Sequence, residues 1–248
     1  MCILFIAVEQ HPNYPVIICA NRDEFHQRPT QKMHWWQQQN ILAGKDLQAG
    51  GTWLGLSREG DFSALTNFRR PNSFDQHKRS RGDLVLQALN NNSNKTQQIL
   101  LQSSQQYNDF NLVFGPLNKL QAFDSVSQKF VTLTPGFHSV SNGALDDIWP
   151  KMALGVKNLE DLITANNIDV EAFFSIMMNQ TTANKSQLPA TGIDNTLELL
   201  LSSIFIVSPS YGTRSTAIIM QSSKGTIEVY ERNYSPDGEI VTQDKFEF

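Results

Sequence analysis

The chain has 248 residues, of which 40% are hydrophobic and 18% charged, and its formal net charge is −4. This composition is typical of a soluble globular protein, and the acidic balance excludes a general electrostatic attraction to nucleic acid or to an anionic membrane surface. The two cysteines are too few for a disulfide framework, so we expect a free thiol and a cytoplasmic location. The apolar run after Met1 is too short to span a bilayer and lacks the basic segment of a secretory signal. We therefore expect no integral membrane association.

Position 2 is a cysteine, at the start of an apolar run over residues 2–8. Initiator methionine is normally removed when the second residue is small, which would make Cys2 the mature N-terminus. Such a cysteine carries a thiol and an α-amine on one residue, and the amine (reference pKa about 8) can take the proton of the thiol (reference pKa about 8.5). The alternative is that Cys2 is a small apolar residue that begins a buried strand.

A second apolar run over residues 16–20 follows a polar stretch that contains two prolines, and this pattern predicts a β-hairpin. If the two runs pair antiparallel around Pro12, facing positions sum to about 24. The expected pairs are Val8 with Val16, Leu4 with Ala20 and Cys2 with Arg22.

Arg22 and Asp23 belong to a polar burst, residues 21–24, directly after the second run. A guanidinium beside a thiol favours the thiolate, and a carboxylate can hold the terminal ammonium. Neighbouring residues of a strand point to opposite faces, so both side chains reach Cys2 only if the chain bends or bulges there. The alternative is a solvated strand end with opposite charges.

The remaining elements alternate between groups of strands and pairs of helices. Turn glycines and alternation predict short antiparallel strands up to residue 67. Beyond them, helical spacing predicts helices over 83–90, 96–107, 149–164 and 170–180. We expect further strands over 111–114, 120–123, 130–133, 138–142, 204–208, 215–221 and 226–231.

No repeat and no long biased linker divides the chain, so we predict one domain over residues 1–248. An open doubly wound fold needs regular strand–helix alternation, which this order lacks. Two largely antiparallel sheets covered by helix pairs fit better, which is an α+β fold of the four-layer αββα kind.

Three polar residues beyond the hairpin sit where a catalytic site would need them. Asn67 follows the strand that ends at residue 66, Asn142 ends the strand at 138–142, and Arg214 lies where one strand turns into the next. An asparagine amide can donate a hydrogen bond to a developing oxyanion, and losing one such donor costs about 3 kcal/mol. Turn or cap roles for the asparagines and a surface ion pair for the arginine remain the alternatives.

Six sequence blocks in order resemble the NRDE-motif family, also called the transport and Golgi organisation family. They are Cys2, Asn21-Arg22-Asp23-Glu24, Arg28-Pro29-Thr30, Gly51-Thr52-Trp53-Leu54-Gly55, Leu65-Thr66-Asn67-Phe68-Arg69 and Tyr211-Gly212-Thr213-Arg214-Ser215-Thr216. That family is similar in layout to the N-terminal-nucleophile (Ntn) hydrolases, especially the choloylglycine and penicillin V acylases. The resemblance implies an αββα sandwich and maps the catalytic pattern of these acylases onto Cys2, Arg22, Asp23, Asn67, Asn142 and Arg214.

We therefore expect an N-terminal cysteine amidohydrolase that cleaves a small acyl amide through a thioester. We assign Asn21, Trp53 and Phe68 to substrate binding, and we expect no metal and no cofactor, since the five histidines show no paired ligand spacing. The family's eukaryotic members are linked to haem trafficking and lipid metabolism. The alternative is consequently a non-catalytic carrier for a haem-like or acyl-lipid ligand, with Phe25 and residues 34–36 lining an apolar pocket. The oligomeric state stays open.

Overall fold

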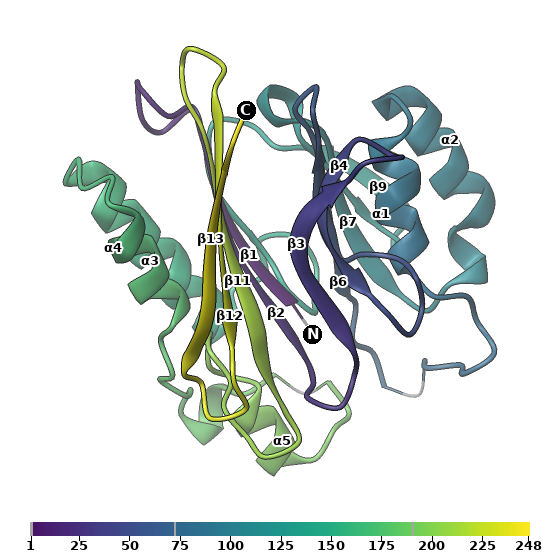
Figure 1. Cartoon of the computed structure of the whole chain (residues 1–248). Coiled ribbons are helices and arrows are strands. Elements are labelled where there is room, and N and C mark those ends of the chain that lie inside the picture. The colour runs from purple at the N-terminus through teal and green to yellow at the C-terminus, as the bar shows by residue number, and fades with distance from the viewer. Residues whose placement is uncertain (1, 72, 190) are drawn as a thin grey trace. The chain divides into compact units, whose positions relative to one another are not determined.

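The computed structural model describes residues 2–71, 73–189 and 191–248, and the chain divides into two compact units. Unit 1 contains both ends of the chain, Met1–Gln27 and Thr134–Phe248, and unit 2 is Arg28–Leu133. Each unit is an antiparallel sheet with a pair of helices packed on it (Figure 1). Met1, whose removal the sequence predicts, lies outside the described residues, and the single domain stays a prediction.

Unit 1 is built on a six-stranded sheet with the strand order β10-β1-β2-β11-β12-β13. Its central strands come from opposite ends of the chain, because β11 pairs antiparallel with β2. The strands are β1 (Cys2–Val8), β2 (Val16–Phe25), β10 (Gly136–Val140), β11 (Tyr211–Gln221), β12 (Ile227–Tyr234) and β13 (Ile240–Glu247), and the helices are α3 (Pro150–Thr164), α4 (Val170–Met177) and α5 (Asn195–Leu200).

The first hairpin has the register that the apolar pattern predicts. Val8 pairs with Val16, Leu4 with Ala20 and Cys2 with Arg22. β2 is longer than predicted, because the polar residues 21–24 continue the strand to Phe25. The register therefore carries the polar residues into the centre of the sheet.

One face of this sheet packs against α3 and α4. Alternate residues of β1, among them Ile3 and Phe5, join the helices in one buried apolar core. Helix α3 approaches very closely at Gly155, where an added Cβ would lie 2.0 Å from Phe5 Cζ. Cys2, Leu4 and Arg22 alternate to the opposite face of the sheet.

Unit 2 has a seven-stranded sheet in the order β3-β4-β5-β6-β7-β8-β9. Helix α1 packs on β5, β6 and β7, and α2 packs beside α1, over a core that includes Trp36, Phe110 and Phe123. The strands are β3 (Thr30–Trp36), β4 (Ile41–Asp46), β5 (Leu54–Ser57), β6 (Asp61–Asn67), β7 (Phe110–Pro116), β8 (Gln121–Asp124) and β9 (Lys129–Thr132), and the helices are α1 (Gly82–Leu89) and α2 (Ser93–Ser103).

Three expectations about the elements differ from the structure. The predicted strand at 204–208 is irregular, because its buried backbone groups bond to side chains, to Asn179 O and to the Thr213 N–H instead of joining a ladder. The strand β13 and the helix α5 were not predicted, because neither has a clear periodic pattern of apolar residues. β13 exposes alternate residues at the sheet edge. The four predicted helices are present, with two ends as predicted and the others shifted by one to four residues.

Candidate active site

Cys2 and Arg22 face each other across β1 and β2. Both lie on the face of the sheet away from α3 and α4, and they are 8% and 6% exposed. A register one residue different would turn Arg22 into the helix-side core, so the hairpin alignment determines this pair.

The Cys2 thiol is protonated at neutral pH in this environment. Burial, with a smaller contribution from the negative charge of Asp23, raises the pKa of the thiol to about 11. The positive charge of Arg22 and a hydrogen bond from the Asp23 backbone N–H act in the opposite direction. Arg22 thus lowers the pKa as predicted, but desolvation is the larger effect.

Asp23 points to the other face of β2, toward the helices. It is 2% exposed, and Thr213 Oγ1 donates a hydrogen bond of 2.7 Å to Asp23 Oδ1. Burial raises the pKa of this carboxyl, against the charges of Lys151 and Arg22 and the Thr213 hydrogen bond. Asp23 therefore contacts the cysteine through its backbone and the helix layer through its side chain.

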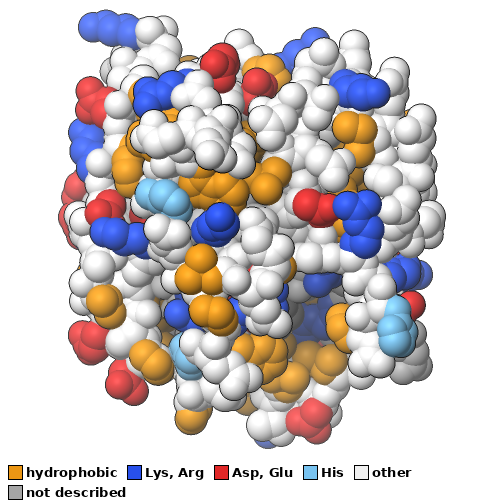
Figure 2. Space-filling model, turned by 45° about the vertical axis from the view of Figure 1, so that its right-hand side comes forward, with side chains coloured by type: hydrophobic (Ala, Val, Ile, Leu, Met, Phe, Trp, Pro, Cys, Tyr) orange, Lys and Arg blue, Asp and Glu red, His pale blue; other side chains and the backbone are white. Residues whose placement is uncertain are grey.

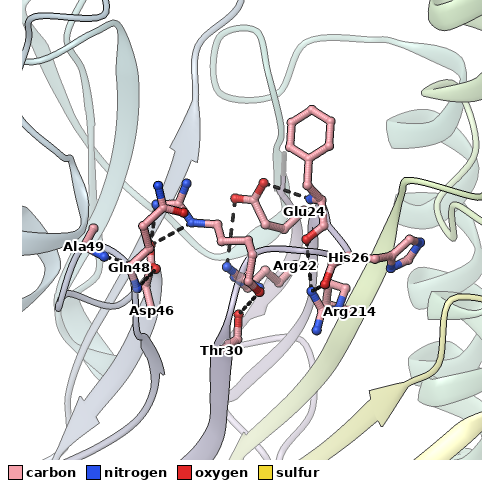
Figure 3. A network of polar contacts seen from close by, with 10 residues as sticks. Arg22, Glu24, His26, Thr30, Asp46, Gln48, Ala49 and Arg214 are labelled. Carbon is pink, nitrogen blue, oxygen red and sulfur yellow. Dashed lines mark hydrogen bonds and ion pairs between the residues drawn. The ribbon is translucent and has the colours of Figure 1, made fainter.

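A β-bulge in β11 lies beside this pair. Thr213 pairs with Asp23 and Ser215 with Arg22, which leaves Arg214 as the extra residue. Arg214 Nη1 donates to the carbonyls of Phe25 and His26, at 3.0 and 3.1 Å, as Figure 3 shows for the backbone at His26. The bulge thus directs a second guanidinium toward the end of β2.

The two guanidinium groups share one electrostatic environment. Burial lowers the pKa of Arg214, and the charge of Arg22 lowers it further, while Glu24 opposes both effects. Arg22 Nη2 lies 3.9 Å from Glu24 Oε2. The strand end is consequently a positively charged site with one partly buried carboxylate.

Asn142 lies in the loop that follows β10 and is completely buried. Leu4 pairs with Val140, and continuing this register by two residues brings Asn142 opposite Cys2. Ser141 Oγ donates to Cys2 O at 3.0 Å and also to Asn142 Oδ1 at 3.3 Å. The loop therefore fixes Asn142 beside the cysteine and sets the direction of its amide.

Asn21 differs from the substrate contact predicted for it. Its side chain is completely buried on the helix side, where Nδ2 donates to Met177 O and Ile204 O at 2.8 and 2.9 Å. Its Oδ1 accepts a hydrogen bond of 2.6 Å from Thr216. The amide is thus fully used in holding β2 to the end of α4 and to the 201–206 segment.

The other three predicted site residues belong to unit 2 and are partly buried there. Asn67 is the last residue of β6 and pairs with Phe110. The Phe68 N–H donates to Asp109 O at 2.9 Å, and Trp53 O accepts from the Leu65 N–H at 2.8 Å. Their roles in oxyanion and substrate binding stay predictions.

The described residues were searched for metal-ligand groups and membrane-spanning helices, and the surface shows how charged side chains are distributed. Among them, no group of three or more His, Cys, Asp and Glu side chains is arranged to hold a metal ion. Within 2–71, 73–189 and 191–248, no helix has the length and hydropathy to cross a bilayer. On the face drawn in Figure 2, basic and acidic side chains are interspersed.

Comparison with known proteins assigns the chain to a family. The family model described as "Transport and Golgi organisation 2" matches residues 1–236. The Transport and Golgi organization protein 2 homologs of Bos taurus and Homo sapiens are each 30% identical over 258 aligned positions, which cover 94% of this chain and 93% of each relative.

The chain belongs to the Transport and Golgi organisation 2 family.

Among solved structures, this member of the Transport and Golgi organisation 2 family is similar to the C2A mutant of conjugated bile acid hydrolase from Clostridium perfringens. The TM-score is 0.50 at 11% identity, over 100% of this chain and 97% of that chain. Identity this low supports the fold alone. The α+β class, the two largely antiparallel sheets and the Ntn hydrolase-like fold are thereby confirmed.

Sequence reasoning did not single out Lys151, one of several buried ionisable residues of this Transport and Golgi organisation 2 protein. Lys151, at the start of α3, is 4% exposed and donates from Nζ to Leu201 O at 3.0 Å. No spacing or motif separates it from the other lysines of the chain. Only its depth in the fold and its charge beside Asp23 distinguish it.

Proposed function

We propose that this protein is an N-terminal cysteine amidohydrolase that cleaves a small, non-peptide acyl amide through a thioester on Cys2. The observation that supports this most directly is the pairing of Cys2 with Arg22 on one face of the central hairpin. The similar bile acid hydrolase supports it further, since its C2A variant means that a cysteine occupies position 2 there as well.

The high pKa of the buried thiol sets a condition on the first step. Since burial raises the pKa of Cys2 to about 11, few thiolates exist at neutral pH. The attack therefore needs a base, and the α-amine of a trimmed Cys2 takes the proton as sulfur adds to the carbonyl carbon. A chain that keeps Met1 has an amide nitrogen at that position and lacks the base.

The remaining groups have separate roles in the proposed reaction. The amide of Asn142, held by Ser141 beside the cysteine, donates to the developing oxyanion. Arg22 stabilises negative charge on sulfur, and the α-ammonium returns its proton to the leaving amine as the C–N bond breaks. Water then hydrolyses the thioester and regenerates the thiol.

A direct test is a screen of acyl amides with processed protein, compared with Cys2→Ala and with Cys19→Ala. Cys19 is the other cysteine and lies in the helix-side core, so its replacement controls for loss of a thiol in general. We expect Cys2→Ala to lose turnover by at least about a thousandfold and Cys19→Ala to keep it. Mass spectrometry of quenched reactions should show an acyl adduct on the Cys2 peptide, with Met1 absent.

Undiminished turnover by Cys2→Ala would refute the mechanism. The alternative, a carrier for a haem-like or acyl-lipid ligand, predicts saturable haem or lipid binding that Cys2→Ala leaves intact, and no hydrolysis. Two of the aromatic residues proposed for that pocket have other contacts: Trp36 donates to Ala43 O from the unit 2 core, and Trp35 stacks on Arg58 at 4.0 Å.

A cytoplasmic location, suggested by two unpaired cysteines, is part of this proposal.

A further inference from the structure

A buried, irregular segment of unit 1, residues 201–206, runs beneath the NRDE end of β2. It forms no ladder, and polar side chains satisfy its backbone. Asn21 donates to Ile204 O, and Ile206 exchanges two hydrogen bonds with Thr213, through its N–H at 2.9 Å and its carbonyl at 2.8 Å. Thr213 in turn donates to Asp23, so the segment lies against the carboxylate side of β2.

Lys151 binds the beginning of the same segment. Its Nζ donates to Leu201 O at 3.0 Å, and the side chain is 4% exposed. Lys151 directly follows Pro150, the first residue of α3, where the helix dipole disfavours a cation. Desolvation and the helix dipole both make a buried ammonium group at a helix N-terminus unfavourable, unless a buried anion compensates for it.

Asp23 is the carboxylate in position to do so. It is 2% exposed and faces the helix layer, and Lys151 is the foremost side-chain charge acting on it. The terminal ammonium also acts on Asp23, and Arg22, the other side-chain charge that does so, belongs to the opposite face of β2. The two buried ionisable groups therefore border the same segment, Lys151 directly at Leu201 and Asp23 through Thr213 at Ile206.

We propose that Lys151 is the buried counter-ion of Asp23 and a positioning residue of the site, which keeps Asp23 ionised and directed at the α-amine of trimmed Cys2. This role rests on the proposed function, since only a trimmed Cys2 has that amine. Lys151 touches no reacting atom. It acts through Asp23, whose backbone N–H bonds to the Cys2 sulfur.

The counter-ion also has a chemical consequence for the base. An uncompensated Asp23 carboxylate would hold the α-amine as ammonium and prevent it from accepting the thiol proton. Lys151 balances that charge, so the amine remains available near neutral pH. Other charged groups of unit 1 near these elements include Arg22 and Glu24 on β2, Arg214 on β11 and Asp147 in the loop after β10. The buried Glu198 of α5 precedes the 201–206 segment and accepts a hydrogen bond from Thr191, and the segment itself contains no charged residue.

A double-mutant cycle tests the pairing without any substrate. Lys151→Met and Asp23→Asn each leave one buried charge unpaired, and we expect each to lower Tm by roughly 10 °C. The double variant leaves neither charge and should melt above both single variants. Lys157→Met, on the exposed side of the same helix, is the matched control and should melt like the wild type. If both single variants fail to fold, a folded double variant supports the pairing.

Additive losses in the double variant, or a double variant that fails to fold, would overturn the proposal. A second readout is the carboxyl-carbon NMR titration of Asp23 in protein labelled at aspartate. Lys151→Met should raise its midpoint by about one pH unit or more, and Lys151→Arg should keep it near the wild type. An unchanged midpoint in Lys151→Met also contradicts the counter-ion. Neither readout needs hydrolysis, so failure of the thioester mechanism and failure of this pairing are distinguishable.

Discussion

Consecutive side chains of the 21–24 motif point to opposite faces of β2. Asn21 and Asp23 point into the helix layer, whereas Arg22 lies opposite Cys2 on the other face. Alternation along a strand explains this division. The motif therefore joins a structural amide, a thiol partner and a buried carboxylate within three positions.

At the residue scale, we expect Asn21→Ala to be strongly destabilising. The variant loses three hydrogen bonds and leaves the buried carbonyls of Met177 and Ile204 without their donor. The expected loss in the free energy of unfolding is about 2–4 kcal/mol, measured by denaturant titration. Asn94→Ala, at an exposed position of α2, should change it by less than about 0.5 kcal/mol. A loss below about 1 kcal/mol for Asn21→Ala would contradict the structural role.

The loop after β10 is the element that brings Asn142 to Cys2, and a histidine–aspartate pair holds it. His138 Nδ1 lies 2.9 Å from Asp146 Oδ2, and the Ser139 N–H donates to Asp146 Oδ1 at 2.7 Å. An added Cβ at Gly143 would lie 2.1 Å from Asp147 Oδ2, so a side chain there would displace the carboxylate that accepts from the Ala144 N–H. The loop is thus closed by side chains and a tight turn.

At the element scale, this pair predicts a pH-dependent loop. The hydrogen bond to Asp146 raises the pKa of His138 above its usual value. The resulting stabilisation is complete below the unfolded pKa of about 6.5 and is lost as pH rises through the folded pKa. Because Asp146 is exposed, we expect the pair to contribute about 0.5–1 kcal/mol at most to the free energy of unfolding.

The matching variant is Asp146→Asn, which keeps an oxygen for the Ser139 N–H and removes the charge that faces His138. Unfolding measured at pH 5.5 and at pH 8.5 should show a wild-type advantage over Asp146→Asn at the lower pH alone. An equal difference at both pH values would rule out the ion pair as the cause.

At the scale of the whole molecule, both chain ends build the sheet of unit 1. β1 and β2 come from the N-terminal segment, and β11 completes the centre from the C-terminal one. β13 lies at the edge and exposes alternate residues, with Lys245 paired to Glu228 and Glu247. The order of strands in space therefore differs from their order in the chain.

Truncation should reveal this difference between edge and centre. We expect a chain that ends at Pro236, without β13, to unfold cooperatively and to lose less than about 3 kcal/mol of stability. A chain that ends at Ser210 lacks β11 as well and should not fold, because β2 then loses a central partner. Circular dichroism and thermal melts distinguish the two. Failure of the longer chain to fold would show that β13 belongs to the core.

The hairpin register and the placement of Cys2 opposite Arg22 were predictable from the sequence. Two apolar runs of strand length that fold back around Pro12 place positions that sum to about 24 opposite each other, which is the observed register. Helix pairs, strand groups and the family were likewise predictable, because they depend on local periodicity and on blocks in order. The strand predicted at 204–208 was wrong since periodicity cannot tell a ladder from a segment whose backbone bonds to side chains.

Tertiary structure alone decided the rest of the site. Lys151 and Asp23 are 128 positions apart, and both border the 201–206 segment only because α3 and β2 pack around it. The same holds for the high pKa of Cys2, because desolvation depends on every neighbour that excludes water. Local sequence determines which residues pair within a hairpin, whereas burial and charge compensation are properties of the packed chain.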